Sequence, residues 1–459
     1  MWIEQYIDRT ILSCNAGYAD EEQFLSRCAR VEAQRPPEDS QTIFPVRMPP
    51  DGGQYLLNTY EQHVLIAGCT GSGKSRRVLI PAILNAMASE DAPSMFVWNV
   101  KGELHAITGA FAEAHGYEVV CIDLIRPEKS AGYSLTDLAV DRYISGDMDG
   151  CEKALADLAC AVSPLPGKNS SMDPFWARVA QNSFMGVALY LLQVTPNRFD
   201  FPAIVAKLME VFADEGSVRR FMDTVERRCG MESSAYRHIK AAMSGSDKTL
   251  QNVCTTVLTD LSEFMKSSAI VSALKRPAPE AMEDPTRRPT VIFFKTSEAS
   301  ETLYRFGQVV FSQIYQRLSV KAGPGKLPRR FFFFLDEVCN GQQIPELDRM
   351  LALCRSKNIC ICLVLQSLKQ LESVYAEKAD TIRSNCGTFI VLRTTDPDTW
   401  ERVSSLAGVD LRGGKLIQPH QLAHLPMGRA LYLTPDSLPY MAQLEDFTML
   451  PWMRGDAQR

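Results

Sequence analysis

Short apolar runs alternate with amphipathic stretches in two separate parts of the chain, 42–140 and 286–459. Continuous apolar runs of this length are typical of strands in a parallel sheet that is covered on both faces, and helical pattern between them is typical of βαβ units. The pattern predicts one α/β domain assembled from both parts. The predicted strands are 63–67, 94–98, 118–122, 290–294, 330–335, 359–365, 388–392 and 429–433.

The stretch between these two parts, 141–285, has a different character. It contains long amphipathic segments, such as 175–194 and 249–265, without strand-like runs between them. This pattern predicts an inserted all-α domain. Residues 1–41 form a lead segment that ends in the linker-like run 35–38, which contains two prolines.

Composition places the chain among ordinary globular proteins. Its 459 residues are 46% hydrophobic and 22% charged, which is enough for two or three domains. The 13 cysteines include no CxxC pair and the chain starts without a secretory leader, so free thiols in the reducing cytoplasm are expected. The apolar stretches 184–192 and 359–365 are shorter than the roughly twenty residues of a membrane span, so no transmembrane helix is expected. A net charge of −5 restricts nucleic-acid contact to a local patch or channel.

The strongest chemical signal follows the first apolar run and precedes a helical stretch, 76–87. Its glycines allow a tight turn whose backbone N–H groups point at phosphates. Lys74 brings a charge to the β- and γ-phosphates of ATP, and the Ser75 hydroxyl is suited to bind Mg²⁺. The context therefore predicts a nucleotide-binding P-loop made of Gly68, Cys69, Thr70, Gly71, Ser72, Gly73, Lys74 and Ser75.

Further polar residues stand where an ATP site needs them. Asp336 and Glu337 follow a strand of phenylalanines, so we expect Asp336 to hold Mg²⁺ and Glu337 to polarise the attacking water. Gln366 ends the next strand and is suited to contact the γ-phosphate, the alternative being a strand-terminal side chain in solvent. Arg355, on a predicted helix 345–357, is either an arginine finger or an exposed surface residue.

Together with several local motifs, these residues resemble the coupling proteins of type IV secretion systems from about residue 63 to residue 451. The resemblance rests on the P-loop with its continuation 76–81, and on 98–104, 173–176, 248–249, 256–258, 335–337 and 365–371. It implies a RecA-like fold with an inserted all-α domain that helps to select substrates. It also implies the finger role for Arg355 and the γ-phosphate sensor role for Gln366. Asn99 stands where the family tends to have aspartate, which leaves the neighbouring Lys101 and Glu103 without an assigned role.

The resemblance implies an ATP-driven motor, active as a homohexamer, that delivers relaxase-bound single-stranded DNA or secreted proteins to the secretion channel. Family members are usually tethered by transmembrane helices, and no such helix is expected in this chain. We therefore expect this chain to be monomeric when dilute, and to be recruited to the inner face of the cytoplasmic membrane by a separate anchor. The alternatives are a nucleotide-switched substrate receptor with little turnover and a different RecA-like DNA translocase.

Overall fold

The computed structural model describes two compact units. One consists of residues 1–120, 284–293 and 319–459, and the other of 121–283 and 294–318. The described residues are 18–32, 35–59, 62–100, 102–165, 173–243, 247–297, 300–337, 339, 343–409, 413–450 and 453.

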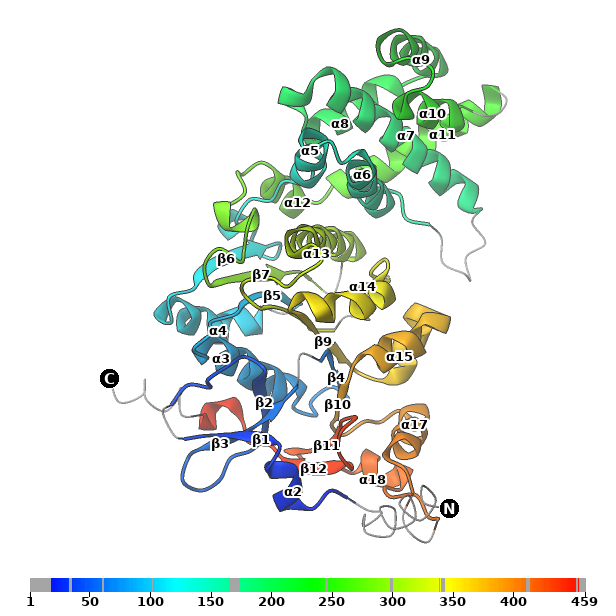
Figure 1. The fold of residues 1–459 in the computed structure, drawn as a ribbon. Coiled ribbons are helices and arrows are strands. Elements are labelled where there is room, and N and C mark those ends of the chain that lie inside the picture. The colour runs from blue at the N-terminus through cyan, green and yellow to red at the C-terminus, as the bar shows by residue number, and fades with distance from the viewer. Residues whose placement is uncertain are drawn as a thin grey trace, which may run out of the picture. The chain divides into compact units, whose positions relative to one another are not determined.

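Nine strands of the described residues form one sheet, in the order β12-β11-β10-β4-β9-β8-β5-β7-β6 (Figure 1). The five central strands β10, β4, β9, β8 and β5 run parallel, and β11 and β12 add an antiparallel hairpin at one edge. Every residue of the five central strands is buried, which explains why they appear in the sequence as unbroken apolar runs. The strands are β4 Val64–Ala67, β5 Ser94–Asn99, β6 Glu118–Asp123, β7 Thr290–Lys295, β8 Phe331–Leu335, β9 Ile359–Leu365, β10 Thr388–Val391, β11 Arg429–Leu433 and β12 Tyr440–Gln443.

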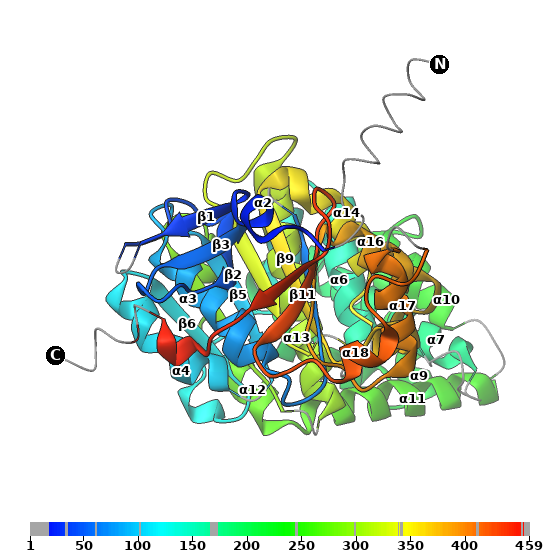
Figure 2. The same ribbon diagram turned by 90° about the horizontal axis from the view of Figure 1, so that it is seen from below.

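Helices cover both faces of this sheet. Figure 1 shows α3 (Ile80–Ala88) and α4 (Glu103–Ala114) on one side of the strands, and α14 (Leu347–Cys354) and α15 (Leu368–Tyr375) on the other. In Figure 2, α3 and α4 again lie opposite α14 and its neighbour α16 (Ala379–Asn385). The remaining helices of this unit are α2 Glu21–Leu25, α17 Pro397–Ala407 and α18 Pro419–Ala423.

A small three-stranded sheet contacts α3 and was not predicted. Its strands β1 (Cys28–Val31), β3 (Gln54–Asn58) and β2 (Thr42–Arg47) pair in that order. The side-chain amide of Asn85 in α3 donates to the Ile43 carbonyl of β2 at 3.1 Å, which ties this sheet to the helix that follows the P-loop. The register of β2 shifts at two places, so alternation along it is broken and the strand signal is weak. The lead segment 1–41 thus includes a strand of this sheet, while residues 1–17 lie outside the described range.

The second unit is built mainly from helices. A Cβ added at Gly186 in α7 would come within 2.5 Å of the Ile239 side chain in α10, so glycine allows these two helices to pack closely. The described residues of 141–285 contain helices and no strand, but the compact unit begins earlier, at Cys121, and includes residues 294–318. The helices are α5 Asp137–Ile144, α6 Met148–Val162, α7 Pro174–Val194, α8 Phe201–Val211, α9 Glu215–Cys229, α10 Ser234–Ala242, α11 Asp247–Met265, α12 Ser268–Leu274 and α13 Glu301–Ala322. Across the described parts of both units, no helix combines the length and apolar character that a membrane span requires.

Candidate nucleotide site

The P-loop connects the end of β4 to a π-helical turn, Lys74–Leu79, that leads into α3. Gly71 and Gly73 have φ angles of +73° and +97°, in the left-handed region that glycine adopts without steric cost. A Cβ at Gly68 would come within 2.6 Å of Ser72 Oγ, so that position also requires glycine. The Cys69 N–H donates to the Arg393 carbonyl at 2.8 Å, which anchors the loop to the segment after β10.

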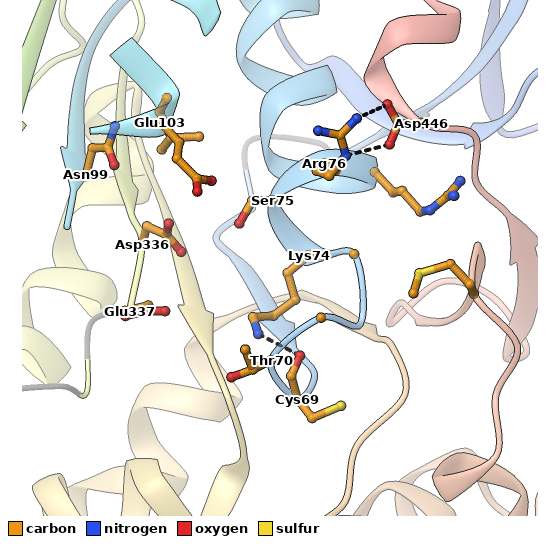
Figure 3. Close-up of a pocket in the computed structure, with 15 residues that line it drawn as sticks. Cys69, Thr70, Lys74, Ser75, Arg76, Asn99, Glu103, Asp336, Glu337 and Asp446 are labelled. Carbon is orange, nitrogen blue, oxygen red and sulfur yellow. Dashed lines mark hydrogen bonds and ion pairs between the residues drawn. The ribbon is translucent and has the colours of Figure 1, made fainter. Parts of the chain in front are cut away.

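Lys74 lies within the curve of this loop. Its side chain is buried and bends back so that Nζ donates to the carbonyls of Gly68 and Cys69, the latter at 3.1 Å (Figure 3). Ser75 points toward the acidic side of the site in the same view. The lysine and the serine therefore line one cavity from the P-loop side.

The acidic pair lines the same cavity from the end of β8. The Asp336 N–H donates to the Trp98 carbonyl of β5 at 3.3 Å, which fixes the start of the turn. Glu337 has a φ of +56°, a left-handed conformation that is uncommon for a residue other than glycine. Such strained residues often occur at functional sites, where the surrounding structure holds them in place.

A third carboxylate comes from the start of α4. Asn99 is buried at the end of β5, and its side-chain oxygen accepts the Gly102 N–H at 2.8 Å, so it shapes the turn that leads into α4. Glu103, the first residue of that helix, lines the cavity and points toward Ser75 in Figure 3. Lys101 lies outside the described residues.

The wall beyond the P-loop is made by residues for which the sequence predicted no role in the nucleotide site. The cavity holds about 480 Å³, and this wall consists of Arg76, Arg77, Met427 and Asp446. Arg76 Nε and Nη2 donate to the two carboxylate oxygens of Asp446, both at 2.7 Å. Burial favours a raised pKa for Asp446, but hydrogen bonds from Arg76 and Thr448 together hold that pKa below its ordinary value. Asp446 is far from the P-loop in sequence and belongs to no motif, so no local signal marks it.

Gln366 and Arg355 lie outside the cavity lining. Gln366 directly follows β9, between the ends of β4 and β8, and its backbone N–H donates to Gln370 Oε1 at 3.2 Å. It therefore shares the P-loop edge of the sheet, and its sensor role stays a prediction. Arg355 begins a short 3₁₀ turn, Arg355–Lys357, just before β9. It therefore lies at the edge of the sheet opposite the P-loop, and its side chain is exposed. The predicted helix 345–357 is thus α14 followed by this turn.

A polyphosphate with a divalent cation fits this set of groups. The P-loop side offers the Lys74 ammonium and the Ser75 hydroxyl, and the opposite side offers carboxylate oxygens, which are the ligands that Mg²⁺ prefers. Gly68 and Ser72 shape the loop from behind and do not line the cavity.

Comparison with known proteins identifies the family. The family model described as Type IV secretory system Conjugative DNA transfer matches residues 18–410. The chain belongs to this family. The resemblance that the sequence motifs indicated is therefore confirmed.

Curated relatives in this family are distant. Protein VirD4 of Agrobacterium fabrum is 22% identical over 365 residues, which cover 78% of this chain and 51% of that protein. Protein VirD4 of Rhizobium rhizogenes is also 22% identical, with 78% and 50% covered. The chain thus spans about half the length of the curated relatives that it matches.

Solved structures agree in fold. The unbound bacterial conjugative coupling protein TrwB, in a form named TrwBdeltaN70, aligns with a TM-score of 0.64 and 16% identity, covering 94% of this chain and 92% of that one. The plasmid coupling protein TrwB in complex with ADP and Mg²⁺ aligns with a TM-score of 0.64 and 17% identity, covering 94% of each chain. At this identity the similarity shows the fold, and it confirms the predicted RecA-like P-loop class.

Proposed function

We propose that this chain binds ATP with Mg²⁺ in the P-loop cavity and hydrolyses it. Lys74 contacts the β- and γ-phosphates, and Ser75 and Asp336 hold the metal ion. Glu337 polarises the attacking water, and Gln366 senses the γ-phosphate from the neighbouring strand end. When bound, Mg²⁺ neutralises charge that develops on the phosphate oxygens.

One observation carries this proposal: a single cavity has Lys74 and Ser75 on one side and Asp336 and Glu337 on the other. These residues come from the ends of two different strands, so their convergence is independent of the P-loop motif. The solved TrwB complexes with an ATP analogue and with ADP and Mg²⁺ support the choice of ligand.

Steady-state ATPase and nucleotide-binding assays test the site. Lys74→Ala is expected to abolish hydrolysis, because the phosphates lose their cation. Glu337→Gln is expected to bind ATP normally while turnover falls by about 10²-fold or more, because the water loses its base. Lys369→Ala, at an exposed lysine paired with Asp398, serves as the control and keeps wild-type turnover. Equal ATPase rates for wild type and Lys74→Ala would refute the assignment.

We further propose that this ATPase is a motor that delivers relaxase-bound single-stranded DNA, or secreted proteins, to a type IV secretion channel. The family description and the VirD4 relatives support this substrate class. The helical stretch 141–285 is the proposed substrate-selection domain. Capture of partners from donor cells tests the proposal, since relaxase and channel proteins are expected with the full chain.

The same assays separate this motor from a nucleotide-switched receptor with little turnover. A motor requires DNA transfer to fail in Glu337→Gln, whereas a switch tolerates that variant because it still binds ATP.

We also propose that the chain works at the inner face of the cytoplasmic membrane through a separate anchor, because conjugative transfer crosses the cell envelope. Fractionation of donor cells with and without the channel proteins tests that location.

A further inference from the structure

Arg76 is fixed beside the P-loop by the segment that follows β12. Besides the two hydrogen bonds to Asp446, its guanidinium carbon lies 4.6 Å from the centre of the Phe447 ring. A bidentate carboxylate contact and an aromatic face together set the plane of a guanidinium group. The orientation of Arg76 is therefore determined by two residues from the far end of the chain.

The carboxylate that holds Arg76 is itself well anchored. Asp446 Oδ1 accepts the Thr448 N–H at 3.2 Å and the Thr448 hydroxyl at 3.0 Å, at the start of the short turn Phe447–Met449. Arg77 reinforces the attachment, since its Nη1 donates to the Leu444 carbonyl at 2.8 Å. Adjacent arginines thus tie the start of the P-loop helix to one short segment, 444–449.

One nitrogen of Arg76 remains for a ligand. Nη1 makes no hydrogen bond or ion pair with the described residues, and in Figure 3 it points away from Asp446, toward the side of the cavity with Ser75 and Glu103. The pKa of Arg76 is raised, mainly by its hydrogen bonds to Asp446 and in smaller part by the charges of Asp446 and Glu103. A charged donor of fixed direction therefore faces the cavity.

The position of Arg76 indicates which phosphate it meets. Asp336 and Glu337 lie on one side of the P-loop in Figure 3, and Arg76 with Asp446 lies on the other. The reacting end of a nucleotide belongs beside the metal-binding and catalytic acids, so its nucleoside end belongs on the Arg76 side. We propose that Arg76 is a ligand of the nucleoside-side phosphate, and that Asp446 and Phe447 position it. This inference rests on the proposed function of the same cavity.

Binding measurements on the full chain test this role. The dissociation constants of ADP and of a non-hydrolysable imido analogue of ATP, both with Mg²⁺, are measured by calorimetry for wild type and Arg76→Gln. A charge-assisted hydrogen bond corresponds to about a tenfold or larger change in affinity. Both dissociation constants are expected to rise by the same factor, because both nucleotides carry the nucleoside-side phosphate.

The chain contains a matched control. Arg30 also pairs with a carboxylate, Asp51, and lies over an aromatic ring, that of Tyr55, and its side chain is 54% exposed, as is that of Arg76. It belongs to the small three-stranded sheet and does not line the cavity. Arg30→Gln is therefore expected to leave both dissociation constants within about twofold of wild type.

A positioning role for Asp446 has its own signature. Asp446→Asn is expected to weaken both nucleotides, and the double variant with Arg76→Gln is expected to bind no worse than Arg76→Gln alone. Tighter binding by Asp446→Asn would overturn the positioning role, because it would mean that Asp446 competes with the nucleotide for Arg76. An unchanged affinity in Arg76→Gln, or a loss confined to the ATP analogue, would overturn the ligand assignment alone. A wild-type chain that binds neither nucleotide would overturn the proposed function and this inference with it.

Discussion

His63 links three elements near the amino-terminal ends of the parallel strands, which is the edge of the sheet opposite the P-loop. Its Nδ1 accepts the Ile361 N–H of β9 at 3.0 Å, so Nε2 carries the proton and donates to the Leu351 carbonyl of α14 at 2.9 Å. The ring is buried just before β4. Burial, with a smaller contribution from the charge of Arg355, lowers the pKa of His63 to about 4, although the bond to Leu351 opposes the shift.

This lowered pKa predicts a loss of stability on mild acidification. The unfolded chain binds a proton at His63 near pH 6.5, whereas the folded chain resists protonation until about pH 4. The free energy of unfolding is therefore expected to fall with decreasing pH across this interval, by about 3 kcal/mol from this residue. Urea denaturation at several pH values measures the effect.

Two variants isolate the contribution of His63. His63→Gln keeps hydrogen-bonding groups but cannot titrate, so its stability is expected to change less between pH 6.5 and pH 4 than that of wild type. His420→Gln, at an exposed position on α18, is expected to follow the wild-type curve. Parallel curves for wild type and His63→Gln would contradict the prediction.

At the scale of elements, a buried ion pair joins the ends of β6 and β7. Lys295 Nζ lies 3.1 Å from Asp123 Oδ2, and the two side chains are 3% and 2% exposed. Asp123 also accepts the N–H groups of Ile125 and Arg126, at 3.0 and 2.9 Å. The carboxylate thus holds the turn after β6 and the end of β7 at once.

Removal of one partner from this pair is expected to be costly. Asp123→Asn leaves the Lys295 charge buried without a counter-charge, and we expect the free energy of unfolding to fall by about 3–5 kcal/mol. Asp398→Asn, which breaks the exposed pair with Lys369, is expected to cost less than about 1 kcal/mol. Denaturant unfolding monitored by circular dichroism measures both. A loss below 1 kcal/mol in Asp123→Asn would show that Lys295 finds another partner or water.

At the scale of the whole molecule, the position of Arg355 predicts that assembly controls activity. Arg355 is exposed at the edge of the sheet opposite the P-loop of its own chain, so it can only serve as an arginine finger for a neighbouring subunit. ATPase activity per subunit is therefore expected to rise with protein concentration, or on a DNA or membrane scaffold, with a hexamer as the working form. A dilute monomer is expected to be nearly idle, because a finger contributes about 10³–10⁵ in rate.

Mixing two inactive variants tests this trans arrangement. Lys74→Ala and Arg355→Ala are each expected to be inactive, and a mixture is expected to regain part of the activity, because some interfaces pair an intact P-loop with an intact finger. Arg349→Ala, at an exposed arginine on α14, the helix just before the turn that begins with Arg355, is the control and is expected to stay active alone. A mixture that co-assembles without activity, or a dilute monomer that hydrolyses ATP at full rate, would refute the role of Arg355.

Local pattern alone was sufficient for much of this protein. The eight predicted strands are all present. The five central ones were the clearest, because strands buried on both faces leave unbroken apolar runs. The P-loop and the acidic pair were also identified in advance, since each needs particular residue types within a few positions of a strand end. Their meeting in one cavity followed from the rule that parallel strands present their carboxyl ends at the same edge.

Tertiary structure decided what depends on contacts between distant parts of the chain. The Arg76–Asp446 contact joins residues with no shared motif, and β1 to β3 lack the alternation that marks a strand, so neither was visible in the sequence. Arg355 was predicted to lie within a helix, 345–357. In the structure it begins a separate short turn before β9, and this turn exposes its side chain at the edge of the sheet opposite the P-loop. The grouping of residues 294–318 with the helical unit likewise depends on packing, because an amphipathic helix does not specify which neighbour covers its apolar face.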